Sequence, residues 1–495
     1  MFYVTEKVSD PDSAKLAKGR SGYRSQTAFP QRGRDRNGLP PLKKAETVVR
    51  TRLNETIVVS CCLLSLAAFS ACRKSSETDS AGLKSDAPSV TGKEIAPASV
   101  PKDDPVAVAA LEAAGYLMKK NSDGVVTDFS VASENDISAS LVQLAGIPSV
   151  QSAIFTGPGI SDNGMEAIAK LSKLKRLDLT DSTIGPKTLE AAGKLPLLEA
   201  LFLRRTPVKD DDLAAITGLP KLRAIDVRNT NISDAGMKHL AKIKTLQDVQ
   251  LEKSKVTDVG LAELKSLPLT SLNVNYCVAI GDASMPMIGA MKKLKSIQMD
   301  ATKLSDKGME SISSLTELTR LRIRDTDVTG EGIKHISGLK KLTQLELRGT
   351  SLDDAGLEVI ATLPAVTYFD MAECRIASPE GIKKLAALKG VTTFGFWETK
   401  LNDSVMQAFE GLTKVQDLDL KATSVTDASV PALMKMTELK TLNLSGTQVS
   451  DEGLLQLAKL PKLESLNVSN IQIGYDLIDR IKEVKPELKV VEYEE

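Results

Sequence analysis

The stretch Thr437–Asn470, TELKTLNLSGTQVSDEGLLQLAKLPKLESLNVSN, contains nearly the same phrase twice. The pattern L-x-x-L-x-L begins at Leu439 and begins again at Leu463. Self-similarity at a fixed period of about 20–50 residues is typical of chains built from stacked structural repeats. This stretch therefore predicts a solenoid, in which each repeat contacts mainly its two neighbours.

The same pattern recurs over most of the chain at intervals of 23 to 25 residues. Its first positions are Val126, Val150, Leu174, Leu198, Leu222, Leu246, Leu269, Leu294, Leu318, Leu342, Val366, Val391, Val415, Leu439, Leu463 and Leu488. A single copy cannot bury its apolar face alone, and stacking provides the missing cover.

Each copy divides into a strand, a turn and a helix. In LTQLELRGTSLDDAGL, Leu345 and Leu347 lie two apart, as they must to share the buried face of a strand. Thr350 then supplies a small polar side chain for backbone groups left free at the turn. A Ser or Thr followed by Asp indicates a helix start, where the hydroxyl group caps free N–H groups and the carboxylate complements the helix dipole. A glycine recurs shortly after, as at Gly356, and predicts helix packing too close for a Cβ.

These units resemble the leucine-rich repeat. The resemblance implies a curved α/β solenoid, a horseshoe of about 16 repeats of about 24 residues with parallel strands on the concave face and helices on the convex face. Many such families place Asn where this chain has Thr or Cys, and this difference points to the variants with outer helices. We expect an N-terminal cap helix within 105–125, with Pro105–Lys119 helical, repeats over 126–474, and a C-terminal cap over 475–495 that ends in a strand with Leu488, Val491 and Tyr493.

Three zones precede the repeats. Residues 1–47 are basic and have no apolar period, so we expect them to be unfolded. Residues 48–72 contain Arg50 and Arg52, followed by an apolar run over 57–71 that suits a signal peptide better than a membrane span. Residues 73–104 are rich in Ser, Asp, Lys, Ala and Pro and are expected to form a flexible tether. Because a signal normally begins at the initiator, we expect translation to start at a non-AUG codon at Val48, Val49 or Leu53, without the leader.

The sequence Phe69-Ser70-Ala71-Cys72 resembles a bacterial lipobox, although Phe69 stands where that motif usually has Leu. The resemblance implies that Cys72 is lipidated and becomes the new N-terminus. The alternatives are a plain secretory signal cleaved nearby and an uncleaved anchor. With the repeats, this segment resembles the leucine-rich repeat lipoproteins of planctomycete-type bacteria, which implies export and a lipid anchor in the cell envelope.

The composition and the motifs argue against several functions. Lys+Arg and Asp+Glu both number 64, so no net charge points to nucleic acid. The two histidines, His239 and His335, lie on the predicted helix surface four repeats apart, or about 20 Å at strand spacing, which is too far for a shared metal site. Cys277 and Cys374 occupy the threonine position and are also four repeats apart, which is too far for a disulfide. No phosphate-binding loop, metal-ligand spacing or nucleophile motif occurs. We expect no catalytic residues, metal or cofactor, and a monomer.

The concave face is where a ligand is expected. Arg, Tyr and Trp are the residue types that anchor protein interfaces. The candidate ligand-binding residues are Phe202, Arg204, Arg228, Tyr276, Arg322, Arg324, Arg348, Tyr368 and Trp397. We expect Tyr368 and Trp397, one repeat apart, to lie over one side chain or sugar ring of a partner.

Two functions of different kinds follow. The first is a non-enzymatic module, anchored in the envelope, that binds a protein or a glycan on its concave face. The second is an intracellular adaptor resembling the substrate-receptor repeats of F-box proteins, which requires an F-box of about forty residues before the repeats. An enzyme domain in the leader is disfavoured because the leader has no core. A mixed-charge face that only keeps the solenoid soluble remains the alternative to a binding site.

Overall fold

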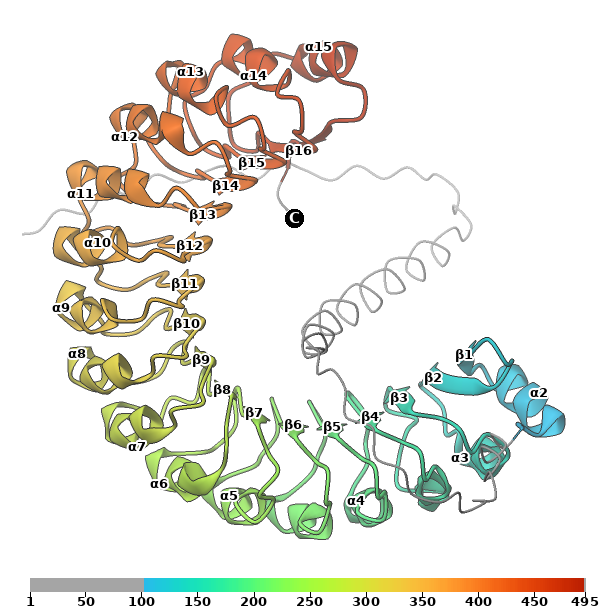
Figure 1. Ribbon diagram of the computed structural model, residues 1–495. Helices are drawn as coiled ribbons and strands as arrows, with labels where there is room; N and C mark the ends of the chain where they lie inside the picture. Colours follow the sequence, from blue (N-terminus) through green and yellow to red (C-terminus); the bar gives the residue numbers. More distant parts are fainter. Residues whose placement is uncertain (1–101, 494–495) are drawn as a thin grey trace, which may run out of the picture. The chain divides into compact units, whose positions relative to one another are not determined.

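The computed structural model describes residues 102–493. Within these residues, 17 strands form one sheet in which β1 is antiparallel to β2, and β2 to β17 each pair in parallel with the next strand along the chain. The strands follow the inner side of a curved array and the helices follow its outer side (Figure 1). The predicted curved α/β solenoid is confirmed, with one strand for each of the 16 aligned repeats.

The strands are β1 (Leu117–Lys120), β2 (Val126–Ala132), β3 (Ser152–Thr156), β4 (Arg176–Asp178), β5 (Ala200–Phe202), β6 (Ala224–Asp226), β7 (Asp248–Gln250), β8 (Ser271–Asn273), β9 (Ser296–Gln298), β10 (Arg320–Arg322), β11 (Gln344–Glu346), β12 (Tyr368–Asp370), β13 (Thr393–Gly395), β14 (Asp417–Asp419), β15 (Thr441–Asn443), β16 (Ser465–Asn467) and β17 (Lys489–Val491). The α-helices are α2 (Pro105–Ala113), α3 (Ser138–Leu141), α4 (Pro186–Ala192), α5 (Asp234–Leu240), α6 (Asp258–Ala262), α7 (Met285–Ala290), α8 (Asp306–Met309), α9 (Gly330–Ile333), α10 (Asp354–Ile360), α11 (Pro379–Lys383), α12 (Asp403–Ala408), α13 (Val430–Leu433), α14 (Asp451–Leu457) and α15 (Leu477–Val484). Shorter 3₁₀ turns, labelled η, continue or replace these helices: η1 (Val142–Gly146), η2 (Met165–Lys170), η3 (Asp210–Ile216), η4 (Glu263–Ser266), η5 (Asp282–Ser284), η6 (Glu310–Ser314), η7 (Lys334–Ile336), η8 (Lys384–Ala387), η9 (Phe409–Gly411) and η10 (Asp427–Ser429).

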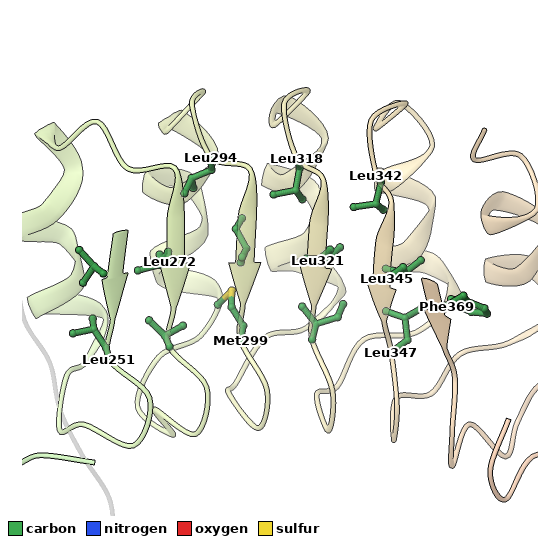
Figure 2. Packing of buried hydrophobic residues seen from close by; sticks show 14 of the residues in the cluster. Leu251, Leu272, Leu294, Met299, Leu318, Leu321, Leu342, Leu345, Leu347 and Phe369 are labelled. Carbon is green, nitrogen blue, oxygen red and sulfur yellow. The ribbon is translucent and has the colours of Figure 1, made fainter. Parts of the chain in front are cut away.

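The core is a continuous ladder of aliphatic side chains between strands and helices. Leu321 of β10 is in register with Leu345 of β11, which is in register with Phe369 of β12, and all three are fully buried. Figure 2 shows these side chains pointing to the same side of successive strands. Parallel pairing in constant register therefore repeats one buried position from strand to strand.

The threonine that follows the strand in most repeats donates a hydrogen bond to the backbone, as predicted. The Thr350 hydroxyl group donates to the carbonyl oxygen of Leu347 at 2.7 Å. The same bond, to the carbonyl three residues earlier, is made by Ser182, Thr206, Thr230, Thr302, Thr326, Thr399, Thr423 and Thr447. The two cysteines at this position differ: the thiol of Cys374 donates to Leu347 of the preceding repeat at 3.2 Å.

In most repeats the recurring glycine is required by a neighbouring carboxylate. A Cβ on Gly332 would lie 2.5 Å from Oδ1 of Asp306, an oxygen that the Gly332 N–H already donates to at 3.0 Å. Glycine is therefore the residue that lets α9 approach the start of α8. The predicted close packing is confirmed. Its cause at Gly332 is a hydrogen-bonded aspartate, whereas a Cβ on Gly356 would meet Leu352 at 2.6 Å and Cα of Gly330 at 3.1 Å.

The N-terminal cap differs from the prediction of one helix over 105–119. Helix α2 ends at Ala113, and Gly115 adopts a left-handed conformation with φ of 87°. The N–H groups of Gly115 and Tyr116 donate to Glu112 and Leu111, which closes the helix end. The chain then reverses into β1, so the first repeat is covered by a helix and an antiparallel strand.

The C-terminal cap has the predicted helix and strand. Helix α15 packs beside α14, and β17 pairs in parallel with β16. Leu488 is buried, but Tyr493 is exposed and does not belong to the core. Between residues 102 and 493, no helix is long and apolar enough to cross a bilayer. The predicted leader (1–47), the signal segment with Cys72 and all but residues 102–104 of the tether lie outside the described residues.

Candidate ligand-binding face

Three rows of side chains line the concave side of the sheet. The first and third residues of each short strand point away from the core, since only the middle one is buried in the typical strand. The residue two positions after the strand forms a third row. Around the middle of the array, the first row is Asp248, Ser271, Ser296, Arg320, Gln344, Tyr368 and Thr393, the second row is Gln250, Asn273, Gln298, Arg322, Glu346, Asp370 and Gly395, and the third row is Glu252, Asn275, Asp300, Arg324, Arg348, Ala372 and Trp397.

Eight of the nine predicted ligand-binding residues belong to these rows. Tyr368 is in the first row, Phe202 and Arg322 are in the second, and Arg204, Arg228, Arg324, Arg348 and Trp397 are in the third. Tyr276 does not belong to them. It occupies the turn after the third row with φ of 58°, and the Lys253 ammonium group lies 5.0 Å from the centre of its ring. The prediction that Tyr276 belongs to the concave rows is wrong because the chain turns away from the sheet one residue before it.

Tyr368 and Trp397 lie farther apart than the sequence prediction required. Tyr368 is in register with Thr393, and Trp397 follows Thr393 by four residues. At about 3.3 Å per residue, this separates the two side chains by about 13 Å along the strands. The expectation that both rings cover one partner group is therefore wrong. The two residues belong to neighbouring repeats, but Tyr368 lies in the first row and Trp397 in the third.

Trp397 is held by two cations. The guanidinium carbon of Arg348 lies 4.8 Å from the centre of a Trp397 ring, and the Lys421 ammonium nitrogen lies 5.0 Å from it. Arg348 reaches across the small side chain of Ala372, which occupies the third row between them. The indole Nε1 is buried without a hydrogen-bond acceptor. Cation–π contacts fix the orientation of this half-buried ring.

Buried carboxylates hold the central arginines. Asp300 has no exposed side-chain surface, and it accepts from Nε of Arg322 at 2.6 Å and from Nε of Arg324 at 2.9 Å. Burial raises the pKa of Asp300, against the opposing effect of Arg324. Glu346 accepts from Nη2 of Arg320 at 2.7 Å. These ion pairs cross from strand to strand and fix β9, β10 and β11 together.

A second charged group lies toward the N-terminal side. The guanidinium group of Arg228 donates to both carboxylate oxygens of Asp226, and its Nη1 lies 3.9 Å from Glu252. Burial raises the pKa of the nearby Asp248, which accepts from the Gln250 side chain at 2.6 Å. This part of the face carries more acids than bases.

Phe202 and Arg204 complete the predicted set. The Arg176 guanidinium carbon lies 3.9 Å from the centre of the Phe202 ring. Arg204 makes no ion pair or side-chain hydrogen bond within residues 102–493, in contrast to the other predicted arginines. Its charge is therefore available to a ligand.

The described residues offer no metal site, since no group of three His, Cys, Asp or Glu side chains has the geometry to hold one. His239 of α5 and His335 of η7 are half-buried on the convex side, so neither is the fully solvated residue that the sequence suggested. Asp300 and Glu346, which hold the central arginines, are not among the residues predicted from the sequence. The sequence feature that could have identified both acids is their alternation with buried strand residues, which places them on the same face as the arginines.

Comparison with known proteins identifies the repeat. A family model described as a leucine-rich repeat region matches residues 157–381, and a second, described as a leucine-rich repeat, matches residues 435–458. A search among curated proteins gave no match.

Several solved structures are similar to this chain at low sequence identity. An internalin of Listeria monocytogenes is 17% identical over 80% of this chain and 99% of its own, with a TM-score of 0.39. A leucine-rich repeat protein of Leptospira interrogans is 16% identical over 70% and 91%, with a TM-score of 0.46. The ectodomain of an Arabidopsis receptor kinase, solved with a peptide hormone, is 14% identical over 76% and 72%, with a TM-score of 0.47. The matched family models, together with sixteen repeats that each contribute one strand to a single sheet, establish that this chain is a leucine-rich repeat protein.

Proposed function

We propose that this protein is a non-enzymatic binding module, exported and held in the cell envelope by a lipid on Cys72, that binds a protein partner on its concave face. The observation that carries the proposal is the setting of Trp397, a half-buried ring with Arg348 and Lys421 at its faces. Nothing in the core requires this ring, because the inward side of β13 is filled by other residues. Buried aromatic and arginine side chains in fixed orientations are the usual centres of protein interfaces.

The same setting favours a protein over a glycan. Sugars bind to aromatic residues by lying against an open ring face, whereas cations already lie over the Trp397 ring. The indole N–H has no acceptor within the described chain, and a carbonyl or carboxylate oxygen of a protein partner would satisfy it after a small rotation of the side chain.

The runner-up is an intracellular adaptor of the F-box type. Residues 102–125 contain one helix and one strand of the cap, and they do not form an F-box. Membrane fractionation with a radiolabelled fatty acid separates the two functions, since an adaptor would remain in the soluble fraction without label.

The test uses Trp397→Ala, Tyr368→Ala and a convex control, Lys384→Ala. Lys384 lies opposite the concave face and pairs with Glu358 on the surface, so its loss should change stability little. Each purified domain is used as bait for envelope extracts, and a partner is identified as a protein retained by the unmutated chain. We expect Trp397→Ala to lose that partner while Lys384→Ala retains it. Equal recovery by all folded variants would place the binding site elsewhere.

A further inference from the structure

The turns that lead from a helix into the next strand are rich in lysine. Because β2 to β17 are parallel and in constant register, these turns all lie at the edge of the sheet where the strands begin. Figure 2 shows Leu294, Leu318 and Leu342, each from one such turn, side by side at this edge. The turns before β4 to β17, defined here as the lysine edge, contain lysine in every case except before β8, β10 and β12.

Acidic side chains do not cancel the charge of the lysine edge. Its turns contain eighteen lysines and one arginine but only five glutamates and no aspartate. Glu317 and Glu438 are each paired with a lysine of the next repeat, Lys341 and Lys462. Many of the other lysines are exposed and make no side-chain hydrogen bond or ion pair within residues 102–493, among them Lys173, Lys194, Lys242, Lys293, Lys414 and Lys459. A large net positive charge therefore remains at this edge.

The opposite edge of the sheet, where the strands end, has no such excess. Its turns carry both signs, as Lys255 and Lys303 on the one hand and Asp325 and Asp327 on the other illustrate. The aspartates that begin the helices there are already bonded, since Asp306 accepts three hydrogen bonds from the next repeat. The solenoid is therefore strongly cationic along one edge only, and the other edge of a second copy offers few unbonded carboxylates to it.

The described chain also begins at the edge that carries the lysines. The N–H group of Asp104 donates to the carbonyl oxygen of Gly146 at 2.8 Å, where η1 ends and the turn into β3 begins. The carboxylate of Asp103 accepts from the N–H group of Val126, the first residue of β2, at 2.6 Å. The segment that connects the solenoid to Cys72 is therefore attached at this edge and not at the opposite one.

The chemistry of the lysine edge suits a layer of anionic lipid headgroups. An ammonium group is a compact, strongly hydrated charge on a flexible stem, and it lacks the planar fork with which arginine binds single anions. Lysines held near an anionic membrane surface each add to the attraction. The lysine edge follows the curve of the array from β4 to β17 (Figure 1). A layer of headgroups contacts turns anywhere along that curve, whereas a linear polyanion has to bend to follow it.

We propose that the lysine edge contacts the surface of a bilayer that contains anionic lipids. The inference rests on the proposed function for the presence of a membrane, because a lipid on Cys72 holds the chain beside one. The lysines then determine which side of the solenoid faces the headgroups. With the strands directed away from the bilayer, the concave face opens sideways and stays accessible to a partner.

Vesicle binding by the repeat unit alone tests the proposal. Residues 96–495 form a compact unit that contains every described strand and helix and a cap at each end, so this fragment folds without the basic leader and Cys72. Its net charge is negative, because the residues before it hold the excess of Lys and Arg. Attraction to an anionic surface by this fragment therefore requires an uneven distribution of charge.

Co-sedimentation is measured with vesicles of phosphatidylcholine alone and with vesicles that also contain about one third phosphatidylglycerol. We expect the fragment to bind the anionic vesicles at least about tenfold more tightly at low ionic strength. About 0.5 M salt should abolish the difference, because salt screens exposed charges. Equal binding to both kinds of vesicle, or binding to neither, would overturn the proposal.

Two charge-reversal variants locate the contact. The first combines Lys242→Glu with Lys293→Glu on the lysine edge, and the control combines Lys255→Glu with Lys303→Glu on the opposite edge. All four lysines are exposed, and the two variants have the same net charge. We expect the first variant to bind anionic vesicles at least about tenfold more weakly and the control to stay within about twofold of the unmutated fragment. Equal weakening in two variants with unchanged melting temperatures would contradict the proposal.

Energy transfer to a labelled lipid measures the orientation. A fluorophore is attached through Thr413→Cys or through Ser424→Cys, exposed positions in the turns before and after β14. The natural Cys277 and Cys374 are buried, so labelling is confined to the new thiol. Transfer should be clearly greater from position 413, on the lysine edge. Equal transfer from both positions, or greater transfer from position 424, would contradict the orientation.

The other possible occupants give different results. If the anionic vesicles are not bound, heparin binding that is lost in the Lys242/Lys293 variant would assign the edge to a soluble polyanion. Self-association that is lost in the same variant would assign it to a second copy of this chain. Either result would overturn the bilayer contact and leave the proposed function intact, because the fragment lacks Cys72 and partner binding is tested separately through Trp397→Ala.

Discussion

The carboxylate of Asp306 accepts two hydrogen bonds from Thr329 of the next repeat, one from its backbone N–H and one from its hydroxyl group, both at 2.7 Å. The same pair of contacts joins Asp234 to Thr257. It recurs between Asp210 and Ser233, Asp282 and Ser305, Asp354 and Ser378, and Asp403 and Thr426. In these six repeats the Ser/Thr-Asp motif therefore links one repeat to the next as well as starting a helix.

Replacing Asp306 by Ala should destabilise the repeat protein by about 2–4 kcal/mol. The change removes the two bonds to Thr329 and a third to the Gly332 N–H, and it leaves partly buried donors without an acceptor. Urea unfolding followed by circular dichroism measures the loss. The control is Asp327→Ala, at an exposed aspartate without a side-chain hydrogen bond in the described chain, which should change stability by no more than about 0.5 kcal/mol. Equal effects of the two changes would show that the link between repeats contributes nothing.

Two glycines offer a matched comparison. In Gly332→Ala, the added methyl group meets Asp306 at 2.5 Å and Val328 at 3.0 Å, so we expect a loss of about 1–3 kcal/mol. In Gly338→Ala the methyl group meets nothing within 4 Å, so the change should be neutral or stabilise by up to about 1 kcal/mol. Thermal unfolding of both variants checks the pair. A Gly332→Ala variant as stable as Gly338→Ala would contradict the close approach of α8 and α9.

The repeat period made most of the fold predictable. A leucine such as Leu345 shares its period, its burial and its strand register with every copy, so one rule places sixteen strands. Thr350 was predictable for the same reason, because one local hydrogen bond explains its recurrence. The N-terminal cap was not predictable, since it occurs once and its boundary depends on the single left-handed residue Gly115.

The candidate site was predictable as a face but not as a pattern of contacts. Period-two alternation places Arg322 and Tyr368 on the concave side. It does not show that Asp300 is buried beneath two arginines, because the contacts of that carboxylate come from long side chains of the next repeat, Arg322 and Arg324. The helix-dipole interpretation of the aspartate after the capping Ser or Thr misses the link that Asp306 makes for a similar reason: the N–H groups that donate to its carboxylate belong to the next repeat, 23 and 26 residues away.

The Cys374 thiol should resist alkylation in the folded protein. Burial raises its pKa to about 11, so the reactive thiolate is scarce at pH 8. The rate of labelling by iodoacetamide should therefore rise as the pH increases toward 11, and it should increase sharply on unfolding in urea. Cys277 and Cys374 are both buried free thiols, so a reductant should leave the melting temperature unchanged. Rapid labelling at pH 8 without unfolding would contradict the burial of this thiol.

Replacing Cys72 by Ala should release the protein from the membrane. The apolar run over 57–71 and the small residues before Cys72 motivate this prediction. Incorporation of labelled palmitate and partitioning into detergent are measured in cells that express each variant. The control, Cys61→Ala, removes a cysteine from the apolar run and should keep both label and partitioning. Unchanged partitioning of the Cys72→Ala protein would reject the lipid anchor.

The concave face is tested most directly by photo-crosslinking in living cells. A photoreactive amino acid replaces Gln344, an exposed first-row residue between Arg320 and Tyr368, or Glu358, an exposed residue of α10 in the same repeat. The account predicts a discrete crosslinked protein from position 344 that is absent from position 358 and lost on Trp397→Ala. The same crosslinked protein from both positions, or from position 358 alone, would contradict binding at the concave face.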